Sequence, residues 1–554
     1  MTELNASVMV DCRAWLGNLE RIWNGIGFDE INLAYFPRGK VLFHTLSQIH
    51  EVPYYIRNHN ALTSGNGAPS PAWGSGNVFH LLPDGKPYYN WTILNQVYDT
   101  YVQAGCCPLI ELGFMPRDLS TASHQDGWYG DLGQEEYEKD GHWKYPPKDY
   151  ELWAELVYQF VNHWVERFGQ AEVEHWYFEL WNEPDIPHYW RGTLAEYCKL
   201  YDYSVAGAVR ALPTVKIGGP GTTCPAVPKG GDFFKQFLAH CVSGKNHVTA
   251  EQGTRLDFIS FHTKGAFYKQ RRHYNLDLPI PNESPSSFMM MNDIQAGMQI
   301  INRFSNLKDL PVFIDECDPA VGTPYGVYDN PNFIYRNTEF YPTFIIALVR
   351  RILDLNQQFE SKVKMITAWA FYYEGKRFFE GNRTLMDNEN IEKPVLNAFR
   401  LLSHLGTIRL AVQSSHRRDV IQKDAPRVEV DALAALSGQV VTLALWHQAD
   451  EWWATDGPAR VSLKLEHLPF SGKARLTHFR IDREHSNAHT EWVRQGSPQH
   501  PSPSQIERIK SRMGLEWIEP PREVDVQSDG TLSLEFSLPI LGVSLIEIEP
   551  FSFL

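Results

Sequence analysis

Two glutamates, Glu183 and Glu316, each end a run of aromatic or β-branched residues that is typical of a buried strand. Glu183 lies in "HWYFELWNEP" and Glu316 in "LPVFIDE". A facing pair of carboxyl groups suits the hydrolysis of a glycosidic bond, because one can protonate the leaving oxygen while the other attacks the sugar or activates water. These two positions are therefore candidate catalytic residues.

The two glutamates have different neighbours in the sequence. Four aromatic residues flank Glu183, namely Trp176, Trp181, Tyr189 and Trp190. An apolar environment favours the protonated form of a carboxyl group, which predicts that Glu183 is the general acid/base. Arg57 and His59 are candidate donors that would keep Glu316 ionised, as a nucleophile requires.

The elements that position these residues repeat along the first 400 residues. Short strand-like runs alternate with longer amphipathic stretches, which indicates a parallel sheet with crossover helices. The predicted strands cover residues 30–36, 52–59, 107–115, 173–181, 215–220, 256–262, 310–316 and 365–373. Eight strand–helix repeats favour a closed barrel over an open sheet. We therefore predict an α/β fold whose catalytic domain is a (β/α)8 barrel, or TIM barrel, over residues 26–404.

In such a barrel the chemistry comes from the carboxyl ends of the strands, where the loops build the active site. Polar and aromatic side chains collect at the predicted strand ends: Arg57, His59, Glu111, Asn182, Glu183, His262, Lys264, Glu316 and Trp369. The ends of the fourth and seventh strands can face each other across the barrel mouth. That placement would pair Glu183 with Glu316.

The pattern changes after about residue 405 to short alternating strands with few helices, which is typical of a β-sandwich. We assign residues 405–554 to this accessory C-terminal domain. The segment 1–25 precedes the barrel, and we expect its "SVMVDC" to add a strand to the sandwich. Two long connections, 60–92 and 116–149, follow barrel strands, so we expect them to form lids or substrate walls.

Composition excludes several classes of partner. The formal charge is −15, from 51 Lys+Arg against 66 Asp+Glu, which disfavours nucleic acid and anionic membrane surfaces as partners. The N-terminus shows no signal-peptide pattern, and no apolar run is long enough to span a bilayer, so we expect a cytoplasmic protein. The seven cysteines lack the spacing of a zinc site and are expected to be reduced.

Five segments, in order, resemble glycoside hydrolase family 39, a family of retaining clan A enzymes that holds β-xylosidases and α-L-iduronidases. They are "YIRNHNAL", "GCCPLIELGFMP", "EVEHWYFELWNEPD", "YDYSVAGAVRALPTVKIGGPGT" and "PVFIDE". The resemblance covers most of residues 30–405. It implies Glu183 as general acid/base, Glu316 as nucleophile and Asn182 as a donor to the sugar 2-hydroxyl.

The same resemblance implies roles for further strand-end residues. Arg57, His59 and His262 would hold the nucleophile and the sugar, and Trp369 would form the floor of the site. Glu111 is a candidate substrate-binding residue from its place at a strand end. The implied mechanism uses no metal and no organic cofactor. Oligomers are common in the family, which makes a homo-oligomer compatible with the resemblance.

The segments that would bind the sugar are compatible with two substrate classes, a uronide and a neutral glycoside. "LDFISFHTKGA" and "FIDECDPAVG" are more similar to the iduronidase branch, in which residues matching Lys264, Gly322 and Arg383 bind the sugar carboxylate. A lysine beside a carboxylate adds a charge-assisted hydrogen bond. The same lysine can instead donate to the hydroxyls of a neutral sugar, and bacterial β-xylosidases of the family carry a similar His-x-Lys-Gly-Ala segment.

We therefore expect a retaining exo-glycosidase that acts on terminal pentosides, such as the β-D-xylosides of plant-derived oligosaccharides, through a covalent glycosyl-enzyme. One alternative is an iduronidase-like hydrolase of uronides or other decorated glycosides. An alternative of another class is a barrel protein that binds carbohydrate without cleaving it.

Overall fold

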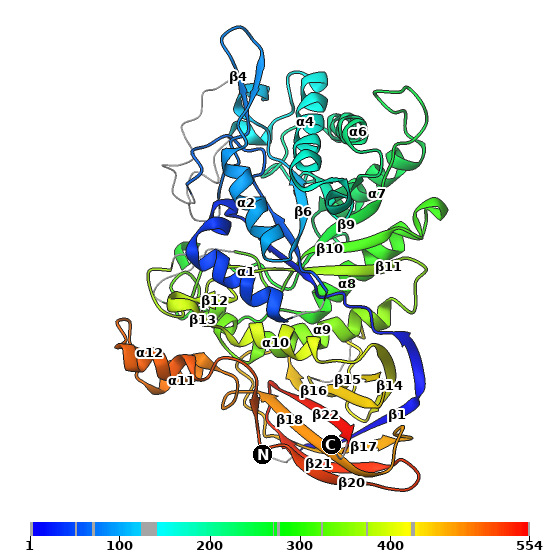
Figure 1. Ribbon diagram of the computed structural model, residues 1–554, viewed down its shortest axis with the longest axis vertical. Helices are drawn as coiled ribbons and strands as arrows, with labels where there is room; N and C mark the ends of the chain where they lie inside the picture. Colours follow the sequence, from blue (N-terminus) through cyan, green and yellow to red (C-terminus); the bar gives the residue numbers. More distant parts are fainter. Residues whose placement is uncertain are drawn as a thin grey trace.

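The computed structural model describes most of the 554-residue chain. The described residues are 4–49, 52–68, 73–122, 141–269, 271–273, 278–322, 325–372, 375–422 and 427–551. Figure 1 shows two units, a larger one coloured mostly blue to green above a smaller one coloured yellow to red apart from its blue N-terminal strand. The predicted loop 116–149 lies partly outside the described residues, as do parts of 60–92.

The larger unit is built around a closed barrel of eight parallel strands, which confirms the predicted fold. In chain order these strands are β2 (Gly25–Phe28), β3 (Tyr55–Asn58), β6 (Cys107–Leu112), β7 (Tyr177–Leu180), β8 (Lys216–Thr222), β9 (Phe258–Lys264), β10 (Pro311–Asp318) and β11 (Lys362–Trp369). The barrel closes where β11 pairs with β2. The strands are almost entirely buried, as expected for a parallel sheet covered by helices.

The predicted first strand, residues 30–36, is wrong. Residues Ile31–Tyr35 form a 3-10 helix, and the strand is Gly25–Phe28, which pairs with β3 and β11. Its sequence, "GIGF", gives a weak strand signal because glycine is depleted in strands. Gly27 is needed at that position, because a Cβ there would lie 2.2 Å from the Trp369 ring.

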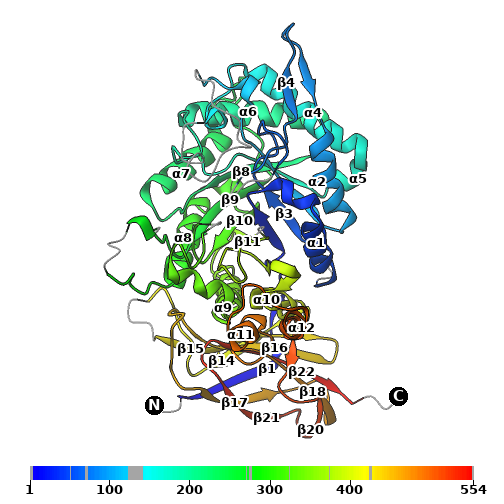
Figure 2. The same cartoon turned by 90° about the vertical axis from the view of Figure 1, so that its left-hand side faces the viewer.

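An α-helix follows each barrel strand and covers the barrel from outside (Figure 2). These helices are α1 (Pro37–Ile49), α2 (Thr92–Gln103), α4 (Tyr150–Phe168), α6 (Leu194–Ala211), α7 (Pro228–Ser243), α8 (Ser287–Ile301), α9 (Phe340–Leu355) and α10 (Pro394–Ser403). Side chains cap several of them. In α6, Thr193 and Glu196 form a capping box, which satisfies amide groups that the first helical turn leaves without a carbonyl partner. Among the described helices, none is long and apolar enough to cross a membrane.

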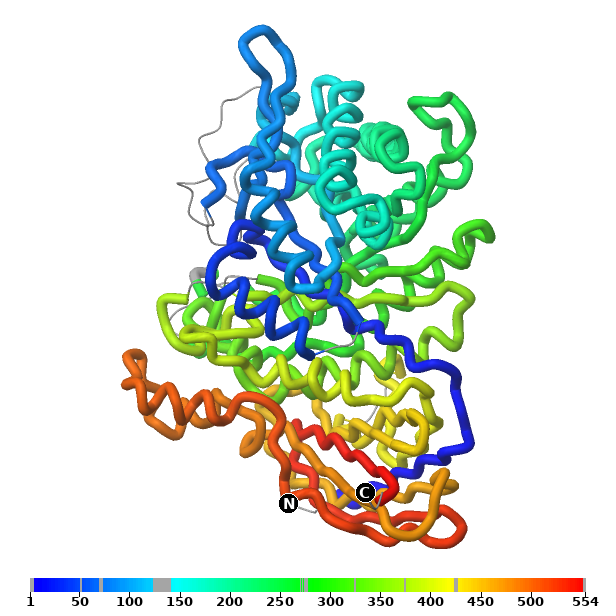
Figure 3. The backbone as a smooth tube through the Cα atoms, viewed as in Figure 1, coloured from blue at the N-terminus to red at the C-terminus, as the bar shows by residue number. Residues whose placement is uncertain are grey.

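The smaller unit is a ten-stranded sheet bent over a hydrophobic core of its own. Its strands are β1 (Leu4–Asn18), β14 (Ile408–Ser414), β15 (Val428–Ser437), β16 (Val440–Ala449), β17 (Ala459–Glu466), β18 (Gly472–Ile481), β19 (Glu516–Trp517), β20 (Arg522–Val526), β21 (Leu532–Leu538) and β22 (Gly542–Pro550). The N-terminal strand β1 lies between β14 and β17, and Figure 3 shows this blue segment crossing the lower unit. Two helices, α11 (Ala488–Arg494) and α12 (Pro503–Lys510), project from it.

Helix α9 joins the two units. Arg350 binds Asp431 of β15 at 3.1 Å, and Arg351 binds Glu429 of the same strand. Thr343 donates its hydroxyl to a backbone oxygen of the loop before β22 at 2.7 Å. These buried contacts fix the smaller unit beneath the barrel (Figure 1).

Part of the long connection 60–92 is a hairpin of β4 (Phe79–Leu81) and β5 (Pro87–Tyr89), which projects from the barrel. Trp73, from the same connection, packs against Trp143 of the other long connection with ring centroids 4.5 Å apart. Both rings also contact Phe114, which follows β6. The two insertions therefore meet beside the carboxyl end of β6. Further short elements of the described residues include α5 (Gln170–Val173), β12 (Met386–Asp387) and β13 (Ile391–Glu392).

Candidate active site

The barrel brings the strand-end residues together at the carboxyl ends of its strands. Pairing of β9 with β10 aligns His262 with Glu316 and Lys264 with Asp318. A register shift between Ile314 and Glu316 interrupts this pairing. Nine of the ten candidate site residues are connected by direct contacts, and Arg383 joins them through Asp318: Arg57, His59, Glu111, Asn182, Glu183, His262, Lys264, Glu316, Trp369 and Arg383.

Arg57, on β3, is the central cation of this set. Its fully buried guanidinium lies 2.6 Å from Glu179, 3.2 Å from Glu316 and 3.3 Å from Asp315. It also lies 3.3 Å from Glu111. Burial lowers the pKa of Arg57, but the carboxylates outweigh it and raise that pKa well above its usual value. Arg57 therefore stays charged and holds four carboxyl groups in place.

Glu316, on β10, is surrounded by cations and possible donors. Lys264 Nζ lies 2.5 Å from its Oε2, and Arg57 and His59 approach its Oε1 at 3.2 and 3.5 Å. Burial raises the pKa of Glu316, but Lys264, His262 and then His59 and Arg57 outweigh that effect and hold it well below the usual range. Glu316 is therefore an ionised carboxylate at neutral pH, which suits a nucleophile.

Glu183 follows β7 and faces Glu316. Its Oε1 lies 2.8 Å from Nδ1 of His262, and its side chain is 14% exposed. One carboxylate oxygen of Glu183 and one of Glu316 lie within 4.8 Å of each other, with His262 Nδ1 within the same distance of both. The two candidate catalytic carboxyl groups are therefore close neighbours across the barrel mouth.

The prediction that Trp176 lies beside Glu183 is wrong. This residue precedes β7, at the amino end of the strand, where its Nε1 donates to Glu172 at 3.0 Å and its ring packs against Trp164. The ring of Trp181 packs against Trp190 with centroids 5.1 Å apart. The nearest polar partner of Glu183 that the structure describes is instead the imidazole of His262.

The backbone turns sharply as it enters the site after β7. Trp181 has a φ of 68° and Glu183 a φ of 43°, both in the left-handed region that non-glycine residues seldom adopt. The amide of Glu183 donates to the Gly221 carbonyl of the neighbouring strand at 2.8 Å. Such strain persists only where the surrounding structure holds it, and it is concentrated at functional sites. Here it directs the side chain of Glu183 towards His262.

Asn182 is buried between these residues. Its Oδ1 accepts a hydrogen bond from Arg57 at 3.1 Å. That bond orients the amide, and its Nδ2 has no hydrogen-bond partner among the described residues. Asn182 can therefore donate to an incoming hydroxyl group.

His262 bridges the two carboxyl groups of this site and a third beneath them. Its Nδ1 lies near Glu183, and its Nε2 lies 3.2 Å from Asp315. Burial lowers the pKa of His262, but Glu316 and Asp315 outweigh it and raise the pKa to about 10. His262 is therefore cationic at neutral pH, and both of its ring nitrogens are donors.

Lys264 and Arg383 share one buried carboxylate, Asp318. Lys264 donates to Asp318, and Arg383 Nη1 lies 2.6 Å from the same oxygen. Burial lowers the pKa of Lys264, but Asp318 and Glu316 raise it above its usual value. The two cations of this corner are thus balanced by two carboxylates that belong to the protein.

Trp369, at the end of β11, lies beside His59, with ring centroids 4.6 Å apart. Its Nε1 donates to Asp29 at 3.2 Å. His59 in turn has its Nδ1 2.6 Å from Glu111, so Glu111 orients His59. Glu111 is fully buried, which places it behind the other side chains of the site.

Four acidic residues of the site were missed by the sequence analysis: Asp29, Glu179, Asp315 and Asp318. Asp29 was overlooked because the first strand was placed too late in the chain. Asp318 could have been found, since it stands two residues after Glu316 and alternate residues of a strand point to the same face. Asp315 would be expected on the opposite face, but it too contacts Arg57 and His262.

Comparison with known sequences identifies the family of the chain. The family model described as glycosyl hydrolases family 39 matches residues 73–529. A β-xylosidase of Geobacillus stearothermophilus is 26% identical over an alignment of 508 residues that covers 89% of this chain and 86% of that protein. An α-L-iduronidase of Mus musculus is 24% identical over an alignment of 422 residues that covers 72% of this chain and 61% of that protein.

Solved structures show the same fold. A structure described as the bacterial orthologue of human α-L-iduronidase matches with a TM-score of 0.77 and 20% identity, over 100% of this chain and 85% of that one. A monomeric β-xylosidase from Caulobacter crescentus CB15 matches with a TM-score of 0.75 and 22% identity, over 99% of this chain and 100% of that one. The chain belongs to glycosyl hydrolases family 39 and is a glycosidase.

Proposed function

We propose that the protein is a retaining exo-glycosidase that releases a neutral terminal pentose, such as β-D-xylose, by double displacement. The observation that carries the mechanism is the closeness of Glu183 and Glu316, whose nearest carboxylate oxygens lie within 4.8 Å. Retaining enzymes hold their two carboxyl groups about 5–5.5 Å apart, whereas inverting enzymes leave about 6.5–9.5 Å for a water molecule.

In the first step an oxygen of ionised Glu316 attacks the anomeric carbon, and the bond from that carbon to the leaving oxygen breaks. Protonated Glu183 gives its proton to the leaving oxygen, so the aglycone departs as a neutral alcohol. In the second step Glu183 takes a proton from water, whose oxygen attacks the anomeric carbon and releases Glu316. Two displacements leave the anomeric configuration unchanged.

The surrounding residues support these roles. The cations around Glu316 keep it ionised before attack, and Asn182 Nδ2 is placed to donate to the sugar hydroxyl beside the reacting carbon. His262 orients Glu183 through its Nδ1. It can also stabilise the negative charge that forms on Glu183 when that residue gives up its proton.

The preference for a neutral sugar rests on Asp318. This buried carboxylate already binds both Lys264 and Arg383, the two cations that would otherwise recognise a uronate. A sugar carboxylate placed there would meet Asp318 and Glu316 as like charges, which costs binding energy in a buried site. A neutral pentose would instead use Lys264 as a donor to its hydroxyl groups.

The second candidate is a uronide hydrolase. Two buried cations side by side, Lys264 and Arg383, favour it, because such a pair can share an additional carboxylate when one is bound. The sequence identity to the α-L-iduronidase of Mus musculus, 24%, is also close to the 26% identity to the β-xylosidase of Geobacillus stearothermophilus.

A panel of aryl glycosides decides between these substrates. The panel contains the β-D-xyloside, an α-L-arabinoside, a β-D-galactoside and the α-L-iduronide, each with the same leaving group. We expect the highest kcat/KM on the xyloside. A higher kcat/KM on the iduronide would replace the proposed substrate class. A thermal shift with sugars but no hydrolysis of any glycoside would indicate a carbohydrate-binding protein.

A further inference from the structure

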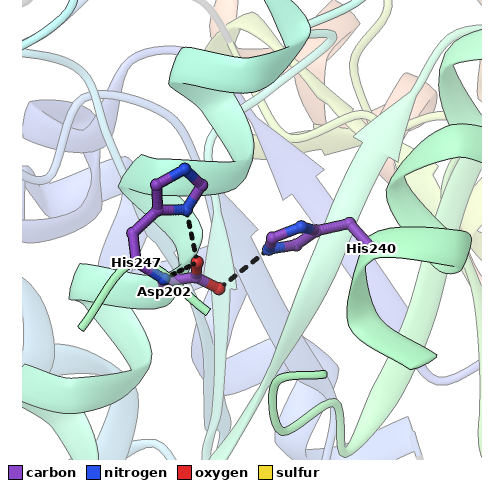
Figure 4. A group of neighbouring side chains, drawn as sticks. All are labelled: Asp202, His240 and His247. Atoms are coloured by element: carbon purple, nitrogen blue, oxygen red, sulfur yellow. Dashed lines mark hydrogen bonds and ion pairs between the residues drawn. The ribbon is translucent and has the colours of Figure 1, made fainter. Parts of the chain in front are cut away.

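Three side chains far from the active site place their metal-ligating atoms together (Figure 4). They are Asp202 of α6, His240 of α7 and His247 of the loop that follows α7. One oxygen of Asp202 and one ring nitrogen of each histidine all lie within 4.8 Å of one another. We propose that this cluster is a binding site for a divalent first-row transition ion of the zinc class.

The geometry is close to that of a coordinated ion. His240 Nε2 lies 2.9 Å from Oδ1 of Asp202, and His247 Nδ1 lies 2.8 Å from Oδ2. An ion bound at about 2.0–2.2 Å by imidazole and carboxylate holds its ligand atoms on the order of 3 Å apart. Small rotations of the two rings would therefore bring all three ligands onto one ion.

The surrounding backbone holds the ligands in place before any ion binds. The amide of His247 donates to Oδ2 of Asp202 at 2.8 Å, which fixes the carboxylate and leaves Oδ1 facing His240. The side chain of Asn246 accepts from the amides of Val248 and Thr249 and so fixes the loop around His247. Ligands oriented by other contacts bind a metal more tightly than free ones.

Gly244 leaves room for the ring of His240 because it has no side chain. A Cβ there would lie 2.3 Å from Nδ1 of His240. The arrangement also leaves an open side, since the side chain of His247 is 38% exposed while that of Asp202 is fully buried. Water can complete the coordination from this side.

The ligand set defines the class of ion. Two imidazoles and one carboxylate suit zinc and its transition-metal neighbours, whereas magnesium and calcium require oxygen ligands. Without an ion, each of the two rings donates an N–H group to Asp202, and a bound ion takes the place of that hydrogen atom. Each neutral ring then carries its proton on the other nitrogen, which for His247 is Nε2.

The position of the cluster indicates a structural role. His247 lies in the segment that leads from α7 to the amino end of β9, whereas Glu183 and Glu316 lie at the carboxyl ends of the strands. An ion there would connect α6, α7 and this segment without touching the reacting sugar. It would stabilise the folded chain by mass action and leave turnover unchanged.

The test is Zn²⁺ titration of the tag-free, chelator-treated full chain by calorimetry, with His247→Ala as the variant. The matched control is His404→Ala, which removes another histidine that is 39% exposed and paired with a single carboxylate, Glu547. We expect one Zn²⁺ per chain in the wild type and the control, and an affinity at least about 100-fold weaker in His247→Ala. Zn²⁺ should raise the Tm of the first two proteins only, and Mg²⁺ should raise none.

Asp202→Asn is the second variant, because asparagine keeps an oxygen acceptor for both rings but removes the charge. It should also lose Zn²⁺ binding while the protein remains folded. Equal Zn²⁺ binding by wild type and His247→Ala, or no saturable binding by wild type, would overturn the proposal. In that outcome Asp202 serves only as a hydrogen-bond acceptor for the two histidines. Hydrolysis of any glycoside is not needed for this test.

Discussion

Nδ1 of His262 lies 2.8 Å from Oε1 of Glu183, while the opposite ring nitrogen lies 3.2 Å from Asp315. Asp315 and Glu179 both bind the buried guanidinium of Arg57, at 3.3 and 2.6 Å. The general acid/base we propose is thus held by a chain of buried groups that extends into the barrel. This relationship carries the first prediction.

Glu179 and Asp315 should respond differently to neutral replacements. Burial, with a contribution from Asp315, raises the pKa of Glu179 well above its usual range, although Arg57 opposes this. This shift favours the protonated form of Glu179, so Glu179→Gln should change kcat/KM by less than about threefold. Burial raises the pKa of Asp315 too, but His262 and Arg57 outweigh it and keep Asp315 ionised. Asp315→Asn should therefore lower kcat by about 10²–10³-fold, as for loss of a group that orients a catalytic residue.

Steady-state kinetics of both variants on one aryl glycoside checks this difference. Circular dichroism and unfolding curves serve as the folding control for both. Equal losses of activity in folded Glu179→Gln and Asp315→Asn would show that the charge of Asp315 has no special role.

The acid limb of the pH profile should depend on Lys264. Among the charges that lower the pKa of Glu316, Lys264 has the largest effect. Lys264→Met removes this positive charge, so the effect of burial, which raises the pKa of Glu316, is opposed by fewer cations and that pKa must rise. Glu316 must be ionised to attack, and activity is lost as the pH falls through its pKa. The acid limb of kcat/KM should therefore move to higher pH by about one unit or more.

The measurement is kcat/KM against pH for wild type and Lys264→Met. Arg167→Met is the control, because Arg167 pairs with Asp99 on the outer helices and should leave the profile unchanged. An acid limb that stays in place, or moves to lower pH in Lys264→Met, would contradict the assignment of Glu316 as the group that must be ionised.

Replacing the two proposed catalytic carboxyl groups should give distinct kinetic patterns. Glu316→Ala removes the nucleophile and should lower kcat by at least about 10⁴-fold on every glycoside. Glu183→Ala should spare the first step for a dinitrophenyl glycoside, whose leaving group needs no proton, and affect a disaccharide far more. Pre-steady-state kinetics of Glu183→Ala should show a burst of dinitrophenol, since the second step still lacks its base. Near-normal rates of both variants on a disaccharide would contradict both roles.

Asp318 should control the choice of sugar. In Asp318→Asn the charges of Lys264 and Arg383 are no longer balanced by that carboxylate. A negatively charged glycone should then bind more favourably, and the ratio of kcat/KM for the iduronide to that for the xyloside should rise by about tenfold or more. An unchanged ratio in a folded Asp318→Asn protein would mean that these cations do not contact the substituent at the sugar C5.

The architecture could be predicted from the sequence because each barrel unit repeats a strong local pattern. The strand that carries Glu316 begins with a continuous apolar run, "PVFI", and seven of the eight predicted strand ranges overlap a strand of the barrel. "GIGF" was missed because two of its four residues are glycines, and the apolar residues of "EINLAYF" belong to a 3-10 helix. The site residues at strand ends followed from the barrel geometry.

The contacts within the site could not be predicted in the same way. Asp318 neutralises both Lys264 and Arg383. Each of these two residues lies more than 50 positions from Asp318 in the sequence. The pairing of His262 with Glu183 requires the left-handed turn at Trp181 and Glu183, for which neither residue type has a preference. Local sequence does not encode such distances.

The configuration of the first-formed sugar tests the central proposal most directly. Proton NMR of an aryl glycoside that the enzyme cleaves, recorded before mutarotation, reports that configuration. We predict that the first product has the same anomeric configuration as the substrate, because the short distance between a carboxylate oxygen of Glu183 and one of Glu316 favours direct attack by Glu316 over attack by a water. Release of the opposite anomer would contradict the double displacement through Glu316.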